Sequence, residues 1–286
     1  MKRKQWGATL ATALLALSLS ACQSAHAALP TPTGTTIPHI VIKAHDFSFD
    51  LPQQIDAGLV EIRMTNDGKE PHQAQFARLN DGVTMAQFTT ALKQGLEAIA
   101  PLVTFAGGPG VIDPGQDNVD VVIYLQPGHY VALCFVPGSD HLPHLTKGMI
   151  APFDVVAAQD TAAAQEPQAD QEVKLLDFSY ALPPTIKPGK QTWKISNVGK
   201  QPHEIMVMKL GEGKTMDDVM AFLQKPAGAP PFTDFGGLQA INSGAVGWLN
   251  LDLPAGTYIA ICHVPDPATH KAHAALGMML PFTVNP

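Results

Sequence analysis

The sequence is poor in cysteine, in positive charge and in charged residues generally. Three cysteines among 286 residues are too few for a scaffold held by several disulfides. Lys and Arg number 18 against 25 Asp and Glu, a net charge of −7, so the chain lacks the basic surface that binds nucleic acid. Charged residues are 15% and hydrophobic residues 45%, which excludes a disordered chain. The 24 glycines and 25 prolines favour a turn-rich globular fold built from strands.

Long hydrophobic runs are also scarce. One apolar run, residues 8–21, follows three basic residues and is too short to span a bilayer. It ends in Leu-Ser-Ala-Cys, which looks like a bacterial lipobox, so we expect residues 1–22 to be a lipoprotein signal segment with Cys22 as the lipidated residue. A lipid anchor implies a protein of the bacterial cell envelope that faces the periplasm. The alternative is cleavage after Ala27, which would give a soluble periplasmic or secreted protein.

The rest of the chain contains two copies of one unit. Asn-Asp-Gly-Lys-Glu-Pro-His at 66–72 is matched by Asn-Val-Gly-Lys-Gln-Pro-His at 197–203, and Tyr-Val-Ala-Leu-Cys at 130–134 by Tyr-Ile-Ala-Ile-Cys at 258–262. Two segments rich in Pro, Thr, Ala, Gln or acidic residues read as tethers. We therefore expect a tether at 23–38, a first domain at 39–157, a linker at 158–172 and a second domain at 173–286.

Each copy has the sequence pattern of short strands with one helix between them. Residues 248–253 alternate between two faces, and the Pro-Ala-Gly turn at 254–256 leads into the next strand. Thr84 and Thr215 each begin a capping box with a Gln or Asp three residues later, which predicts a helix start. The predicted fold is all-β: two tandem, antiparallel Greek-key β-sandwich domains, each with one inserted helix.

The chemistry of the chain lies in four side chains that recur in the same order: a distant His, then Cys, His and Met close together. The intervals are Cys-x9-His-x4-Met in one copy and Cys-x10-His-x4-Met in the other. Two imidazoles, a thiolate and a weak axial thioether form the ligand field of blue copper. The candidate ligands are His72, Cys134, His144 and Met149 in the first copy, and His203, Cys262, His273 and Met278 in the second.

These motifs resemble the cupredoxin superfamily, whose members carry type 1 blue copper. The stretch Pro-His-Leu-Thr-Lys-Gly-Met at 143–149 is similar to the type 1 copper loop of copper nitrite reductases. The resemblance covers nearly the whole mature chain. It implies a cupredoxin-like fold and up to two coppers, one per domain, each with equatorial His, His and Cys and an axial Met.

The sequence departs from the copper enzymes of that superfamily at two points. Nitrite reductases and multicopper oxidases place a His directly before the Cys to relay electrons, whereas this chain has Leu133 and Ile261 there. No His-x-His pair of the kind that binds a trinuclear cluster occurs. We therefore expect a protein that is not an enzyme.

Simpler interpretations of the same residues stay open at this point. The two Cys could be ordinary core residues or could form a disulfide with each other, and the two Met could be core packing. His141 and His270 precede the loop ligands at equal spacing and are possible alternative ligands. Asn66 and Asn197 could either hydrogen-bond across the ligand loop and hold the Cys segment in place, or only form a turn between strands.

The predicted function is copper-based electron transfer in the cell envelope. The partners expected are envelope redox proteins or copper-handling proteins, together with a membrane reached through the lipid anchor. The first alternative is copper homeostasis, as buffering or delivery, with the same ligands. The second is a metal-free adhesion or scaffold module on the same fold.

Overall fold

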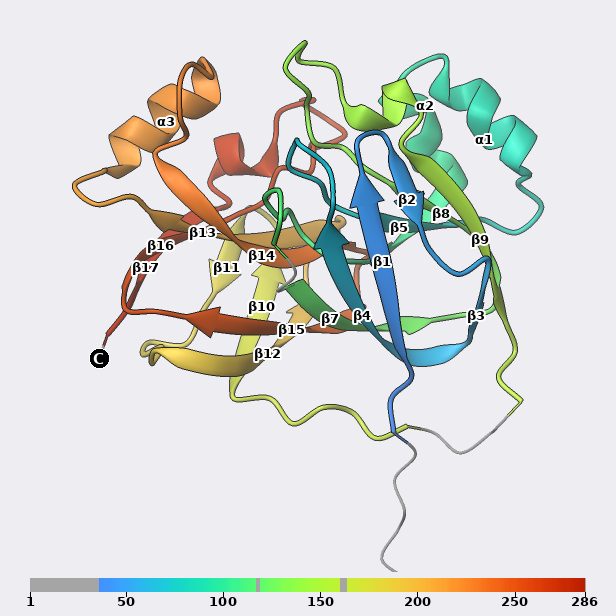
Figure 1. Cartoon of the computed structure of the whole chain (residues 1–286), viewed down its shortest axis with the longest axis horizontal. Helices are drawn as coiled ribbons and strands as arrows, with labels where there is room; N and C mark the ends of the chain where they lie inside the picture. Colours follow the sequence, from blue (N-terminus) through green and yellow to red (C-terminus); the bar gives the residue numbers. More distant parts are fainter. Residues whose placement is uncertain (1–35, 117–118, 160–163, 286) are drawn as a thin grey trace, which may run out of the picture. The chain divides into compact units, whose positions relative to one another are not determined.

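The computed structural model describes residues 36–116, 119–159 and 164–285 (Figure 1). These residues belong to one compact unit that spans 34–286. The predicted signal segment with Cys22, and most of the predicted tether, lie outside the described residues. No helix among the described residues is long and apolar enough to cross a membrane.

The two repeats contain corresponding series of strands. In the first repeat the strands are β1 (His39–His45), β2 (Ser48–Asp50), β3 (Gln54–Asp56), β4 (Gly58–Asn66), β5 (Gln75–Leu79), β6 (Val103–Gly107), β7 (Val119–Leu125), β8 (Gly128–Leu133) and β9 (Ile150–Val156). In the second repeat they are β10 (Gln171–Leu176), β11 (Ser179–Ala181), β12 (Gly189–Asn197), β13 (His203–Leu210), β14 (Phe232–Ile241), β15 (Val246–Leu253), β16 (Gly256–Ile261) and β17 (Met279–Val284). The expected all-β fold class is confirmed.

The helices begin where the capping boxes predict. Helices α1 (Met85–Leu92) and α3 (Met216–Gln224) each follow a threonine that accepts a hydrogen bond from the backbone N–H three residues later. The first repeat differs from the expectation of one helix, because α2 (Leu96–Ile99) and the 3-10 turn η1 (Ala100–Leu102) follow α1. Gly95, with φ +127°, is the residue at which the chain leaves one helical direction and begins the next.

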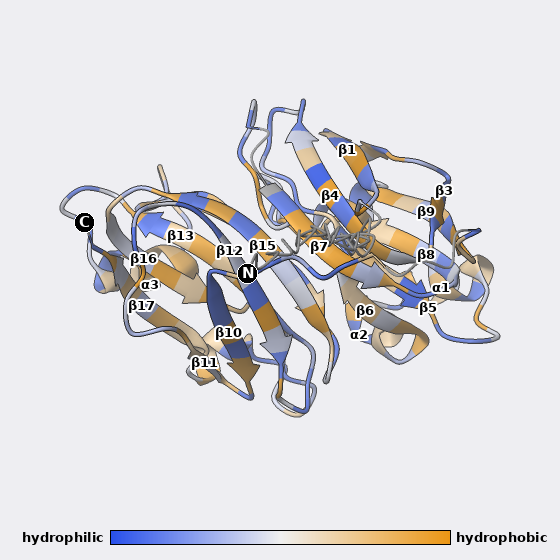
Figure 2. Cartoon of the chain, turned by 90° about the horizontal axis from the view of Figure 1, so that it is seen from below, coloured by the Kyte–Doolittle hydropathy of each residue, from blue (hydrophilic) through white to orange (hydrophobic). Residues whose placement is uncertain are grey.

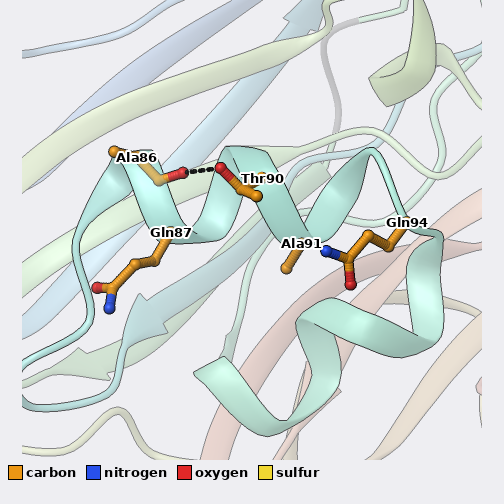
Figure 3. A pocket seen from close by; sticks show the side chains of 5 residues that line it. All are labelled: Ala86, Gln87, Thr90, Ala91 and Gln94. Carbon is orange, nitrogen blue, oxygen red and sulfur yellow. Dashed lines mark hydrogen bonds between the residues drawn. The ribbon is translucent and has the colours of Figure 1, made fainter.

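A shallow depression on α1 is lined by Ala86, Gln87, Thr90, Ala91 and Gln94 (Figure 3). The hydroxyl of Thr90 donates to the Ala86 carbonyl at 2.8 Å. None of the five side chains is titratable or a usual metal ligand, so the depression offers no acid–base or metal chemistry.

The strands form an eight-stranded and a nine-stranded sheet. Most neighbours are antiparallel, but β1 pairs with β4, β10 with β12 and β3 with β9 in parallel. The sheets are therefore mixed, whereas the sequence indicated antiparallel strands. The reason is that the chain folds back through β2 before β4, so that β4 runs in the same direction as β1.

One hydrophobic core lies between the sheets. Along β4, buried residues alternate with half-buried ones, and the ribbon alternates in hydropathy (Figure 2). Ile62 of β4 belongs to one sheet and Phe76 of β5 to the other, and both are fully buried in the same cluster. Facing apolar sides of two sheets are the defining contact of a β-sandwich.

Strands of the two repeats also pair with each other, β7 with β15 and β6 with β14. The buried amide of Gln75 adds a link, since its Nε2 donates to the carbonyls of Gly107 and Ala240 at 3.1 and 3.0 Å. The predicted linker lies between the end of β9 and the second repeat, and its residues 160–163 lie outside the described residues. The expected domain boundaries stay a prediction.

Candidate metal centres

The fold brings together six of the eight predicted metal ligands in two groups. In each group the donor atoms of two His and one Cys lie within 4.8 Å of one another, and all three residues are buried. The groups are His72, Cys134 and His144 in the first repeat, and His203, Cys262 and His273 in the second. Among the described residues, no other set of three His, Cys, Asp or Glu side chains is arranged in this way.

Rigid elements position each donor of the first group. His72 forms an isolated bridge with Ile112 just before β5, and Cys134 follows the last residue of β8. His144 opens the 3-10 turn η2 (His144–Lys147) in the loop that returns from β8 to β9. The Cys134 Sγ lies 3.5 Å from His144 Nδ1 and 3.9 Å from His72 Nδ1, and the two Nδ1 atoms are 3.1 Å apart.

The second group repeats this geometry. His203 is the first residue of β13, Cys262 follows β16, and His273 opens the turn η3 (His273–Leu276). The Cys262 Sγ lies 3.4 Å from His273 Nδ1, and the two Nδ1 atoms are 3.0 Å apart. In both repeats Nδ1 of the histidine in the ligand loop faces the sulfur, and the Nδ1 atoms of the two histidines face each other.

The opposite nitrogen of each histidine contacts an oxygen acceptor. His72 Nε2 lies 3.4 Å from Asp46 Oδ1 in the first repeat, and His203 Nε2 lies 2.9 Å from Asp177 Oδ1 in the second. The other histidine of each group lies in the ligand loop and is called the loop histidine below. Its Nε2 lies 2.7 Å from Glu70 Oε2 for His144 and 2.9 Å from Gln201 Oε1 for His273. An acceptor at Nε2 places the proton there, which leaves the Nδ1 lone pair free to bind a metal.

The residues that contact the outer nitrogens were not predicted. Asp46 and Asp177 stand in matched Asp-Phe-Ser motifs, so the repeat comparison contained the signal. Glu70 and Gln201 stand at the same position of the matched segments that end at His72 and His203, where one segment has Glu and the other has Gln. A sequence pattern alone does not show that these oxygens reach the imidazole rings.

Without a metal, burial shifts the pKa values of both thiols and of three of the histidines. It raises the pKa of the Cys134 thiol to about 11 and that of the Cys262 thiol even more. Burial also lowers the pKa values of His72 and His203, and, with the charge of His203 added, that of His273 to about 4. At neutral pH these histidines are therefore neutral and ready to coordinate, whereas each thiol must lose its proton when a metal binds.

The donor set of each group fits copper. Imidazole suits Cu(II), the soft thiolate suits Cu(I), and a trigonal His, His, Cys arrangement is the equatorial set of a blue-copper site. The two groups therefore offer places for up to two copper ions.

Met149 and Met278 are fully buried beside these groups. The carbonyl of Met149 accepts from Cys134 N–H at 3.4 Å, and its N–H donates to His144 O at 3.1 Å. The corresponding Met278 distances are 3.1 and 2.9 Å. The backbone thus holds each Met next to the Cys and loop His, and the axial role of the thioether stays a prediction.

The structure does not bring His141 or His270 into either group. Both are exposed and have left-handed φ angles of 63° and 57°, in the middle of the ligand loops. His270 Nδ1 instead lies 2.8 Å from Glu97 Oε1 of α2, and both side chains are exposed. The alternative of a disulfide is also wrong, since Cys134 and Cys262 are both free thiols.

In the part of the chain that the structure describes, the matched asparagines form the predicted turn, and they bond to the strand beside the first His and not to the Cys segment. Asn66 Nδ2 donates to the carbonyl of Ile112, the bridge partner of His72, at 3.0 Å, and Asn197 Nδ2 does the same to Ile241 at 2.8 Å. The Asn66 Oδ1 also accepts from the N–H two residues later, as in an Asx turn. Each asparagine therefore shapes the turn and ties it to the strand beside the ligand.

No protein-family model and no curated protein sequence matches the chain. Among solved structures, the chain is similar to a reduced auracyanin from Roseiflexus castenholzii (22% identity, 40% of this chain, 95% of that chain, TM-score 0.30). It is also similar to auracyanin A, a blue copper protein from Chloroflexus aurantiacus (16%, 41%, 99%, 0.27), and to a copper nitrite reductase from Nitrosomonas europaea (15%, 87%, 94%, 0.25). Likenesses at these identities and TM-scores do not assign a function, so the function is inferred from the geometry of the two donor groups.

Proposed function

We propose that this protein is a copper-binding electron-transfer protein of the bacterial cell envelope, with one type 1 copper site in each repeat. In each site the two His Nδ1 atoms and the Cys sulfur would hold the copper, and Met149 or Met278 would add a thioether as the fourth ligand. The observation that carries the proposal is the convergence of two Nδ1 atoms and one sulfur in a buried position, twice in the same chain.

Bound copper would supply a centre that gains or loses one electron. The protein supplies a rigid and dry environment for it: all six His and Cys donors are buried, and each histidine is held by an acceptor at its outer nitrogen. Donor atoms that are held in place before the metal binds move little when the copper changes its oxidation state. Such a site favours fast electron exchange.

The envelope location and the partners rest on the N-terminal sequence. A signal segment that ends at Cys22 would attach the protein to a membrane, where it would exchange electrons with other envelope redox proteins. No catalytic copper is part of the proposal, because Leu133 and Ile261 stand where copper enzymes of the resembled superfamily carry a relay histidine.

Electron transfer and copper delivery use the same ligands and are separated by kinetics. The copper-loaded protein should exchange electrons between its oxidised and reduced forms many times before a Cu(I) chelator removes the metal. Mixing the two forms and following electron self-exchange by NMR line broadening measures the first rate, and chelator competition measures the second. Rapid loss of copper with slow self-exchange would instead favour delivery or buffering.

A further inference from the structure

The two donor groups differ in the residue that contacts the loop histidine from outside. In the matched seven-residue segments at 66–72 and 197–203, the fifth residue is Glu70 in the first repeat and Gln201 in the second. The Glu70 carboxylate accepts from His144 Nε2 at 2.7 Å, and the Gln201 amide oxygen accepts from His273 Nε2 at 2.9 Å. The same hydrogen bond thus ends on a charged acceptor in one repeat and a neutral acceptor in the other.

The surroundings of each acceptor are adapted to this difference. In the second repeat, Gln201 Nε2 donates to Asp266 Oδ1 at 2.9 Å, which turns the amide oxygen toward His273. In the first repeat, Gly138 stands where Asp266 stands in the second. A Cβ at Gly138 would collide with Lys147 and lie 3.2 Å from the Glu70 carboxylate, so the glycine leaves the space that these side chains occupy.

We propose that Glu70 lowers the reduction potential of the first copper site, and that Gln201 leaves the second site without this contribution. The inference rests on the proposed function, since it concerns copper held by the two donor groups. It assigns to Glu70 and Gln201 the role of residues that act through a ligand and set the potential of each site separately.

The physical reason is the charge on the ligand. An imidazole bound through Nδ1 to Cu(II) loses more electron density than one bound to Cu(I), so its Nε2–H becomes the stronger donor. A carboxylate acceptor stabilises this more positive state more than an amide does, because hydrogen bonds to ionised groups are roughly twice as strong as neutral ones. Glu70 therefore favours Cu(II) over Cu(I), which lowers the potential.

Other charges near the two sites decide how the test is arranged. Asp46 at the first site and Asp177 at the second occupy equivalent positions, so each site has one such carboxylate. Lys147 is paired with Asp140 at 2.8 Å in the first repeat. The second repeat alone has the buried Glu204, whose Oε1 accepts from the His263 N–H at 2.7 Å. Each site is therefore compared with its own variant and not with the other site.

The experiment uses full-length chains that retain one site each. The Cys262→Ser protein, with and without Glu70→Gln, reports on the first site. The Cys134→Ser, Asp266→Gly protein, with and without Gln201→Glu, reports on the second, because Asp266→Gly removes the carboxylate that would otherwise lie against the new one. Spectroelectrochemical titration of the visible band measures each potential. Glu70→Gln should raise the Cu(I)-over-Cu(II) preference of its site about tenfold, or about 59 mV for one electron. Gln201→Glu should shift the second site downward by a similar amount.

The matched control is Asp56→Asn in the Cys262→Ser background. This variant also removes one carboxylate charge, but at Asp56, an exposed residue of β3 that pairs with Val156 at the end of β9. Potentials that do not move in Glu70→Gln and Gln201→Glu, or that move equally in the control, would overturn the inference while the visible band shows that the sites exist. A parent protein that develops no band with Cu(II) would instead overturn the proposed function, and the inference with it.

Discussion

Of the donor histidines, His144 and His273 each contact a phenylalanine ring as well as an acceptor at the outer nitrogen. Phe47 packs edge-on against His144 with 5.2 Å between ring centres, and Phe178 does the same against His273. Both phenylalanines have left-handed φ angles, 65° and 63°, which are rare for a bulky residue. An unfavourable backbone conformation of this kind persists only where the surrounding structure requires it, and it occurs here at the same place in both repeats.

Asn197 offers a direct test of how hydrogen bonds hold the segment that carries the first histidine ligand. Its Nδ2 donates to the buried carbonyl of Ile241 and to Gln201 O, each at 2.8 Å. Asn197→Ala removes both hydrogen bonds, each of which contributes about 0.5–1.5 kcal/mol, so we expect the free energy of unfolding to fall by about 1–3 kcal/mol. Chemical denaturation of the metal-free protein measures this.

The control for that variant is Asn285→Ala, at an exposed residue near the C-terminus, which should change the free energy of unfolding by less than about 0.5 kcal/mol. Equal stability losses in the two variants would contradict the role given to Asn197.

At the scale of elements, the helices depend on their first residues. Thr215 accepts from the Asp218 N–H, while the Asp218 carboxylate accepts from the Thr215 N–H at 2.8 Å. Thr215→Ala should therefore destabilise the protein by about 0.5–2 kcal/mol, measured by thermal or denaturant unfolding. Thr215→Ser keeps the hydroxyl and should retain most of the stability. A Ser variant as unstable as the Ala variant would show that the hydroxyl is not the cause.

The repeat comparison predicted the elements that are encoded locally. The capping boxes at Thr84 and Thr215 are short-range signals and predicted the starts of α1 and α3. The parallel pairing of β1 with β4 depends on which strands meet after the chain has turned back, and no local pattern contains that information. The second helix α2 was missed because its four residues are too few to show a helical period.

The candidate site also combines features that are encoded locally with contacts that form only in the folded chain. Recurrence of the His, Cys, His order at matched spacing predicted both donor groups, because the ligands lie at strand ends and in one short loop. The partners at the outer nitrogens come from distant segments, since Asp46 is 26 residues from His72 and Glu70 is 74 residues from His144. Such contacts exist only in the folded chain.

At the scale of the whole molecule, the contacts between the repeats include half-buried carboxylates. Asp234 of β14 lies close enough to Asp113 of the first repeat for the two carboxylates to repel each other. Burial first, and then the charge of Asp113, raise the pKa of Asp234 to about 7. Burial also raises the pKa of Asp113.

This raised pKa predicts how stability changes with pH. An unfolded Asp titrates near pH 4, so between about pH 4 and pH 7 the folded state holds more protons than the unfolded state. The contribution of Asp234 to the free energy of unfolding is therefore full below about pH 4 and is lost as pH rises through about 7. Asp234→Asn should remove this loss and stabilise the metal-free protein at pH 8 by more than about 1 kcal/mol.

Denaturant unfolding at pH 5 and pH 8 measures that change. Asp56→Asn, at an exposed carboxylate, is the matched control and should change the pH dependence little. An Asp234→Asn protein with the same pH dependence as the unsubstituted protein would contradict the account of this carboxylate.

The measurement that tests the central claim most directly is titration of the purified mature protein with Cu(II), followed by its visible spectrum and by metal analysis. An intense thiolate-to-copper band should grow until two coppers are bound per chain. Cys134→Ser and Cys262→Ser should each remove about half of the band and one copper, because each removes the sulfur of one donor group. Full absorbance in the double variant, or no band in the unsubstituted protein, would contradict the claim that each repeat holds copper through its buried His, Cys and His.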